Sequence, residues 1–567
     1  MSRAEPLATD TPPARARPSA WGRASLAAVA AASGLVANLP CLFYPLARDQ
    51  GIFAYNTAAL LQGAVPYRDF VDQKPPGILF FYMIPLASFG PAAWGIHLFE
   101  WLVLGATGLV VFLVGRRLAG DGAGIVAAAG CALFHSPAVH DFWDRAQIES
   151  FLTLAYGAVF LLLAGVRPPR QRGLLAGLFA GLIGGACFCL KPNAAGFPLA
   201  AVAALALIDL RHRDFRGTAA RCAAFAAGFA APPAALIGWL AATGGSGPFL
   251  EHALSVNTPY VGSGLRITAL RLAYGIAPVA GGVAVACGLL ALLARRFARG
   301  AYARIVESLG APPERDRHLA LFAATWIGCV ATFVSGRFLF AYHAQALILP
   351  NALTLGLAAP ALGLVRAASP SGTRRVRIAA WAALLVPALI VAATLPPEDR
   401  AFLTGRMLLD DYQGTARFDQ GDFSYREDRA LARAIASRTG PGETVQIFGH
   451  GSLALFLAGR ASATRFSFTP AAMDPRYGRG GADREEILAR LQANPPPLVA
   501  ITSNDPLIQF GVAASDEQVR SFPPLAAFLS SRYRPVARLG DHLLLERRDR
   551  ATTAGARGPL DSPATTP

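Results

Sequence analysis

A long apolar segment followed at once by a charged one decides the fold of this chain. Residues 24–46 read ASLAAVAAASGLVANLPCLFYPL, and residues 47–77 continue as ARDQGIFAYNTAALLQGAVPYRDFVDQKPPG. A membrane span needs roughly 20 mostly apolar residues, so the first segment predicts a transmembrane helix. Charged side chains beside a bilayer are costly and mark functional sites. Asp49, Asp72 and Lys74 are therefore the first candidates for such a site.

The composition of the whole chain also indicates an integral membrane protein. Of its 567 residues 53% are hydrophobic and 16% are charged, whereas about a quarter of a soluble chain is charged. We therefore predict an α-helical polytopic membrane protein, and we interpret the short apolar run 78–90 as an interfacial or re-entrant helix. The eleven predicted spans are 24–46, 92–115, 122–138, 148–166, 173–190, 193–210, 219–241, 272–294, 319–335, 344–365 and 378–395.

Basic residues in the short loops predict the orientation. With the N-terminus inside, the cytoplasmic segments hold 23 Lys and Arg residues and the opposite loops hold 8. Cytoplasmic loops carry the excess of basic residues, so the loop that bears Asp49 is expected outside, together with everything after the last span. The net charge of +16 then favours contact with anionic membrane lipid. Because the basic residues are scattered between spans, we expect no nucleic acid partner.

The composition changes after residue 395, which indicates a domain boundary. We expect a disordered cytoplasmic N-terminus (1–23), a transmembrane core (24–395), an extracytoplasmic domain (396–547) and a disordered tail (548–567). Strands that alternate with helices imply that the third of these is a small α/β domain. The expected strands are 444–448, 463–468, 498–502 and 542–546, and the expected helices are 427–437, 483–493 and 524–531.

The first external loop resembles that of the GT-C glycosyltransferases. Asp49 follows the first span, and Lys74-Pro-Pro-Gly77 comes after it. Family 39 and its bacterial relatives, which include protein O-mannosyltransferases and lipid A aminoarabinose transferases, share an acidic residue and a Lys-Pro-Pro motif in this order. The resemblance implies a GT-C fold and a lipid-phosphate sugar donor. Relatives more often have Asp-Glu where this chain has Asp49-Gln50, which counts against a carboxylate pair or a metal site that uses both positions.

Two interpretations of this loop stay open. Asp49 could cap the helix that begins beside it, or it could be the catalytic base that removes a proton from an acceptor hydroxyl, and the two roles can coexist. The charges of Arg68, Asp69, Asp72 and Lys74 could simply neutralise one another. In the functional interpretation, Lys74 offsets the negative charge that develops on the donor phosphate, and Asp72 belongs to the same substrate site.

Four later residues complete the candidate site. Glu149 stands where relatives have an acidic residue at the outer end of the fourth span, and we predict it as a second catalytic residue. Lys191 could extend to the membrane interface or contact the lipid phosphate. Arg337 carries a planar fork suited to phosphate, and it precedes His343 in a loop that resembles the late Gly-Arg…His-Tyr loop of the family. The alternative for this loop is an aromatic anchor at the interface.

No cofactor is expected. His135, His140 and Asp141 could suggest zinc, but tetrahedral sites need better-placed ligands, and capping of the span end is the preferred interpretation. A divalent cation is possible, although the first loop has no clear carboxylate set for one. The sequence also contains no Walker motif and no dinucleotide fingerprint.

These features predict an inverting glycosyltransferase. It would move a sugar from a polyprenyl-phosphate donor to a hydroxyl of a glycan, lipid or protein acceptor, on the extracytoplasmic side of the bacterial inner membrane. The alternative is a transporter or flippase of lipid-linked sugars, although transporters tend to show paired halves that this sequence lacks. In the C-terminal domain, Arg460 and Arg465 could face an acidic or hydroxyl-rich acceptor, or they could be surface residues.

Overall fold

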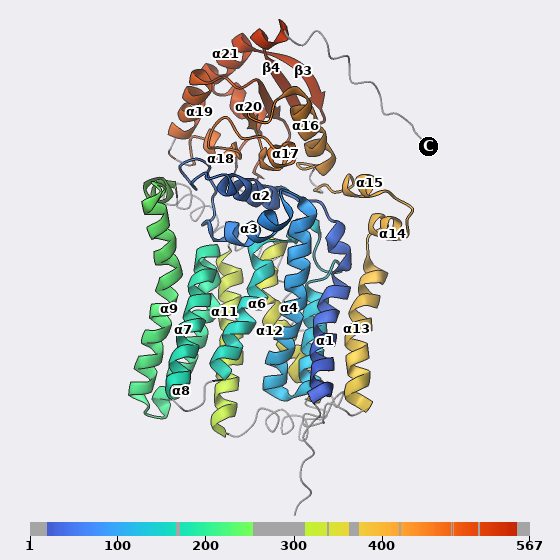
Figure 1. Cartoon of the computed structure of the whole chain (residues 1–567), viewed down its shortest axis with the longest axis vertical. Helices are drawn as coiled ribbons and strands as arrows, with labels where there is room; N and C mark the ends of the chain where they lie inside the picture. The colour runs from blue at the N-terminus through green and yellow to red at the C-terminus, as the bar shows by residue number, and fades with distance from the viewer. Residues whose placement is uncertain are drawn as a thin grey trace, which may run out of the picture.

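The structure is a computed structural model, and it describes the following residues: 20–165, 170–252, 312–336, 340–361, 374–418, 421–477, 479, 481–508 and 511–552. Apolar helices stand side by side in a bundle, and an α/β domain lies over one end of it (Figure 1). The helices α2 (Arg48–Leu61) and α3 (Gly77–Phe89) lie between the bundle and the domain (Figure 1). The first external loop therefore belongs to the boundary between the two layers.

About half of the bundle helices have the length and composition of membrane spans. Within the described residues, five are long and apolar enough to cross a membrane, in α4, α7, α8, α9 and α11, and α13 with α14 (Pro397–Leu403) forms a further candidate that bends by 114°. The bundle helices are α1 (Ala20–Ala37), α4 (Ala93–Ala119), α5 (Asp121–Phe134), α6 (Ile148–Ala164), α7 (Arg170–Leu190), α8 (Gly196–Arg211), α9 (Phe215–Ala242), α11 (Pro312–Ser335), α12 (Ile348–Ala361) and α13 (Arg374–Thr394).

Every predicted span that falls on described residues coincides with one of these helices. The span predicted at 272–294 lies outside the described residues, so the total of eleven stays a prediction. Several helices are shorter than the apolar runs that predicted them, because a turn or 3-10 helix takes the outer end. The first predicted span, for example, divides into α1 and a 3-10 helix at Leu39–Phe43.

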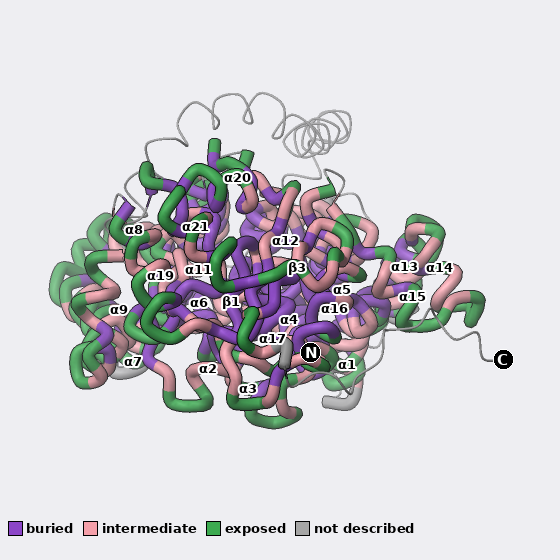
Figure 2. Tube along the Cα trace, turned by 90° about the horizontal axis from the view of Figure 1, so that it is seen from above, coloured by how far each residue is buried: buried purple, intermediate pink, exposed green. Residues whose placement is uncertain are grey.

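Small residues allow the bundle helices to approach closely. On α7, Gly181 and Gly185 lie against the backbone of Phe225 and Phe229 on α9, where any side chain would collide with main-chain atoms. Close backbone approach through small residues is a common way for helices to associate in membranes. Seen along the bundle, the buried part of the chain gathers at the centre around α4 and α6, whereas α9 stands at the rim and is more exposed (Figure 2).

The C-terminal domain is built on a four-stranded sheet with the order β1-β2-β4-β3. The strands β1 (Val445–Phe448) and β2 (Leu498–Thr502) run parallel, and β4 (His542–Arg547) pairs antiparallel with both β2 and β3 (Tyr533–Leu539). The longer helices of the domain are α16 (Tyr425–Arg438), α17 (Ser452–Ala458), α19 (Ala482–Ala493) and α21 (Pro523–Arg532), and the shorter ones are α15 (Leu409–Gln413), α18 (Pro470–Met473) and α20 (Ser515–Arg520).

The strand predicted at 463–468 is wrong, and β3 was missed. Around Ala463 the chain makes only an isolated bridge to Val445 before it turns away. The sequence of β3 contains Pro535 and two arginines, so it does not read as a strand. Its position explains the composition, because proline and charged residues are tolerated on an edge strand.

The domain packs tightly on the first external loop. A Cβ atom on Gly51 of α2 would lie 2.6 Å from Cβ of Leu453 on α17, so only glycine fits there. The backbone N–H of Ser462 donates to the hydroxyl of Tyr55 at 2.8 Å, and that of Val71 donates to the carbonyl of Arg465 at 3.0 Å. The buried core is continuous across this contact. The loop that carries the candidate residues is thus held from both sides.

Candidate active site

Asp49 lies in the first turn of α2, and it does not cap the helix. The residue before the helix is Ala47, and its N–H donates to the side-chain oxygen of Gln50 at 3.1 Å. A carboxylate in the first turn still interacts favourably with the helix dipole. The capping role considered for Asp49 therefore belongs to Gln50, and the carboxylate of Asp49 is left for other contacts.

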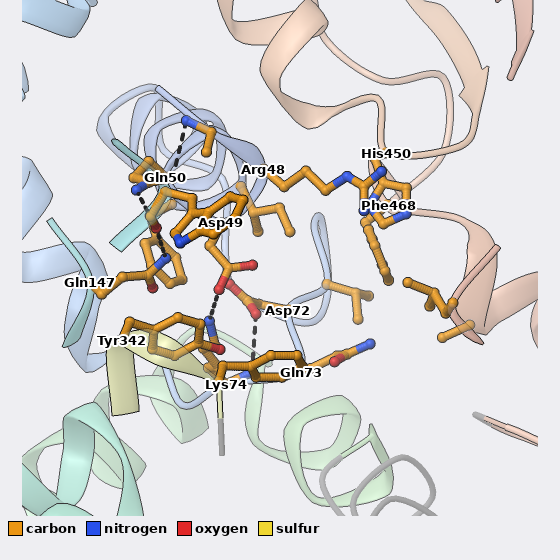
Figure 3. A pocket seen from close by; sticks show the side chains of 18 of the residues that line it. Arg48, Asp49, Gln50, Asp72, Gln73, Lys74, Gln147, Tyr342, His450 and Phe468 are labelled. Atoms are coloured by element: carbon orange, nitrogen blue, oxygen red, sulfur yellow. Dashed lines mark hydrogen bonds and ion pairs between the residues drawn. The ribbon is translucent and has the colours of Figure 1, made fainter. Parts of the chain in front are cut away.

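Asp49 and Lys74 form an ion pair. The ammonium Nζ of Lys74 lies 2.8 Å from Oδ2 of Asp49 and stands over the ring of Phe53, 4.5 Å from its centroid. The side chain of Asp49 is 30% exposed and that of Lys74 is 23% exposed. Figure 3 shows both pointing toward the same space beneath the C-terminal domain. A base and a cation are thus placed side by side at the boundary of the bundle.

Asp72 completes this cluster. Its carboxylate accepts the backbone N–H of Lys74 at 3.0 Å and the amide of Asn56 at 3.2 Å. Burial alone would lower the pKa of Lys74, but the carboxylates of Asp49 and Asp72 outweigh burial and hold that pKa above its usual value. Burial raises the pKa of Asp72, although Lys74 opposes this effect. Lys74 is therefore a permanent cation at neutral pH.

Gln50 links the loop after α1 to the loop before α6. Its side-chain nitrogen donates to the carbonyls of Phe142, Trp143 and Arg145 at 3.3, 3.0 and 2.6 Å, and the residue is fully buried. Only an amide can accept from Ala47 and donate to these carbonyls at the same time. The Gln at position 50, where relatives more often have Glu, thus has a structural reason.

Glu149, Lys191 and His343 form a second cluster. The ammonium of Lys191 lies 2.8 Å from Oε1 of Glu149 and 3.1 Å from Nε2 of His343. Glu149 lies in the first turn of α6 and His343 lies in a 3-10 helix at Ala341–Leu347, and both are buried. This cluster does not line the cavity described below, but Glu149 is close enough to Lys74 to contribute to its raised pKa.

A cavity of about 410 Å³ separates the first loop from the C-terminal domain. Asp49, Asp72 and Lys74 line one side of this cavity. All three were predicted as site residues, and the fold brings them together. The other lining residues come from several distant segments and were not predicted as site residues. They include Arg48, Trp143, Gln147, Tyr342, Phe418, Asp422, His450, Phe466 and Phe468.

The remaining candidates lie elsewhere. Arg337 falls outside the described residues. His140 contacts Asp144 at 3.1 Å, and among the described residues no group of His, Cys, Asp and Glu is placed to hold a metal ion. Arg465 pairs with Glu486 at 2.9 Å, and Arg460 donates to the backbone at the end of α16. Neither arginine lines the cavity, so they do not face an acceptor there.

Comparison with known proteins agrees with this architecture. The family model described as dolichyl-phosphate-mannose-protein mannosyltransferase matches residues 73–235. The crystal structure of ArnT from Cupriavidus metallidurans bound to undecaprenyl phosphate matches with a TM-score of 0.55 at 13% identity, and the match covers 95% of this chain and 100% of that one. The chain is a membrane protein with the GT-C fold. The GT-C fold that the first loop implied by resemblance is thereby confirmed.

Two further GT-C structures match less well. They are the apo state of the same ArnT, with a TM-score of 0.39 at 13% identity over 90% of this chain and 95% of that one, and the Archaeoglobus fulgidus oligosaccharyltransferase, with a TM-score of 0.34 at 13% identity over 84% and 68%. These scores support no argument about the site. No curated protein sequence matches the chain.

Proposed function

We propose that this GT-C protein is an inverting glycosyltransferase that takes a sugar from a polyprenyl-phosphate donor and transfers it to an acceptor hydroxyl on the extracytoplasmic face of a bacterial inner membrane. The observation that carries the proposal is the Asp49–Lys74 pair on the wall of a cavity at the end of the bundle. A base and a phosphate-binding cation at a membrane boundary suit a donor whose hydrocarbon tail stays among the helices. The bound undecaprenyl phosphate of the matching ArnT structure supports a donor of this class.

In the proposed reaction the acceptor oxygen attacks the anomeric carbon of the donor sugar. Asp49 takes the hydroxyl proton as the new carbon–oxygen bond forms. The bond between the anomeric carbon and the phosphate oxygen breaks at the same time, and its electron pair leaves with the polyprenyl phosphate. A single displacement of this kind inverts the anomeric centre.

Lys74 would offset the negative charge that grows on the leaving phosphate. Charged groups fixed before the reaction stabilise such charge more effectively than water does. We propose that Lys191 assists from the membrane side, and that Glu149 acts by holding Lys191, because its carboxylate binds Nζ at 2.8 Å and does not line the cavity. His343, at 3.1 Å from the same Nζ, would help to position it. Arg337 remains a proposed phosphate ligand outside the described residues.

The activity can be tested in proteoliposomes that contain the purified protein. Polyprenyl-phosphate donors with radiolabelled sugars would be supplied with extracts of cell-envelope glycans and lipids as acceptors. The proposal expects label to move from the polyprenyl phosphate to a new product, with release of polyprenyl phosphate. Labelled donor that only changes leaflet, with no new product, would instead identify a flippase and refute the transfer reaction.

A further inference from the structure

We infer that the C-terminal domain forms the acceptor subsite of this cavity, and that the acceptor is an uncharged carbohydrate that offers a hydroxyl. This inference rests on the proposed function and extends it to the acceptor. The wall opposite Asp49 consists of His450, Phe466 and Phe468 from the domain, and Figure 3 shows His450 and Phe468 facing Asp49 and Asp72 across the cavity. An acceptor held on this wall would present its hydroxyl to the base.

The charges of the cavity disfavour an anionic acceptor. Its described lining contains five carboxylates, those of Asp49, Asp72, Asp144, Asp422 and Asp483. The two cations among the same described residues are each paired with one of these carboxylates. Arg48 contacts Asp422 at 2.9 Å, and Lys74 contacts Asp49 at 2.8 Å. Asp483 is paired with Arg479, outside the lining, at 2.6 Å. The carboxylates of Asp72 and Asp144 still exceed the cations around the cavity, so a phosphate on the acceptor would meet excess negative charge, which selects against it.

The histidine of the wall is also uncharged at neutral pH. Burial, and to a lesser degree the neighbouring Arg48, holds the pKa of His450 well below its usual value. Both ring nitrogens are buried and make no hydrogen bond of normal geometry with the described residues, although the backbone of Asp505 lies close enough to oppose the fall in the pKa. A buried polar group of this kind is rarely left without a partner. We infer that a hydroxyl group of the acceptor at this wall supplies one.

The aromatic rings fit a carbohydrate. The rings of Phe468 and His450 meet edge to face at 4.9 Å, and those of Trp143 and Phe418 meet in the same way at 4.9 Å on the neighbouring side. The C–H faces of a sugar ring pack on such surfaces, while its hydroxyls need acceptors such as the carboxylate of Asp422. A binding site of a few hundred Å³ with apolar walls and a few polar groups suits a small ligand.

An extended peptide fits less well. Peptides that bind by their main chain usually add to a free strand edge, and none of the described lining residues lies in a strand of the sheet. The structure thus favours a sugar hydroxyl over the hydroxyl of a serine or threonine in a peptide.

The position of the wall depends on an ion pair between the two layers. The guanidinium of Arg48, next to Asp49 on α2, binds Asp422 of the domain and stands over the rings of Phe418 and Phe423 at 5.1 and 5.9 Å. Together with the contacts of Gly51, Tyr55 and Val71 described above, this ion pair holds the wall over Asp49. Reactions between two bound molecules depend steeply on such positioning.

The test compares three soluble probes with the reconstituted protein and a labelled polyprenyl-phosphate sugar: methyl glucoside, glucose 1-phosphate and a blocked serine peptide. The neutral glycoside is expected to have a KM at least tenfold lower than either alternative. His450→Ala and Phe468→Ala should each raise the KM for the glycoside about tenfold and leave the KM for the lipid donor within twofold. His450→Asn should restore part of the loss, since it keeps a hydrogen-bonding group.

Matched controls come from the far end of the bundle. His212→Ala and Phe215→Ala change exposed residues of the same types and should leave both KM values within twofold. Preferred use of glucose 1-phosphate or the peptide would overturn the inference, as would unchanged KM values in the two cavity variants. Binding of the probes is measured in parallel by saturation-transfer NMR. Specific glycoside binding that is lost in His450→Ala, without any donor consumption by the wild type, would uphold the subsite and refute the transferase function instead.

Discussion

Replacement of Asp49 by Asn is the most direct test of the catalytic loop. The change keeps the size of the side chain and removes its basicity. Loss of a general base costs typically 10²–10⁴-fold in rate, which corresponds to about 2.7–5.4 kcal/mol at 1.36 kcal/mol per tenfold. The fold should tolerate the change, because the carboxylate of Asp72 remains beside Lys74 to balance its charge. We therefore expect a loss of kcat without a comparable rise in the KM for the donor.

The assay follows polyprenyl phosphate released from a labelled donor by protein in nanodiscs, and a melting curve of each variant reports on folding. Asp69→Asn is the matched control in the same loop. Asp69 pairs with Arg68 at 2.6 Å and does not line the cavity, so its variant should keep the wild-type rate within twofold. If Asp49→Asn retained more than half of the wild-type kcat, Asp49 could not be the base, and the Asp49–Lys74 pair would be structural.

Four other predictions follow from contacts described above. Gln50→Glu should lower the melting temperature by several degrees, because it places a carboxylate against three carbonyls, and it should not create a requirement for Mg²⁺ or Mn²⁺; activity restored or raised by either ion would contradict this. Gly51→Ala should cost about 1–3 kcal/mol through overpacking, and Leu453→Ala should relieve it in the double variant; additive losses would show that the two residues do not collide. The depressed pKa of His450 means that the unfolded chain binds a proton below about pH 6.5 that the folded chain does not, so stability should fall from pH 7 to pH 5; the fall should be smaller in His450→Asn, and an equal fall in both proteins would assign it to other groups. A reporter fused after Leu395 should be active only in its extracytoplasmic form, and a cytoplasmic signal would refute the predicted topology.

Local patterns predicted most of the bundle but little of the cavity. Apolar runs such as that of α4 predict a helix because their length and composition are properties of one segment. The pairing of Asp49 with Lys74 was not predicted, since the two residues are 25 positions apart and their pairing depends on the path of the chain between them. His450 and Phe468 lie about 400 residues beyond the catalytic loop, and nothing in their surroundings marks them as site residues. His450 and Phe468 reach the cavity because the C-terminal domain docks on α2, where Gly51 meets α17.

The same docking sets the order in which the protein can become active. The hydrogen bond between Tyr55 and Ser462 joins residues 407 positions apart. At a synthesis rate of roughly 5–20 residues per second, the catalytic loop emerges about 20–80 s before its partner exists. During that time no C-terminal domain covers Asp49 and Lys74, so the nascent chain has no complete site. Under the proposed function, activity is therefore coupled to completion of the polypeptide, and a membrane-inserted fragment that stops before α17 would not consume the lipid-linked donor.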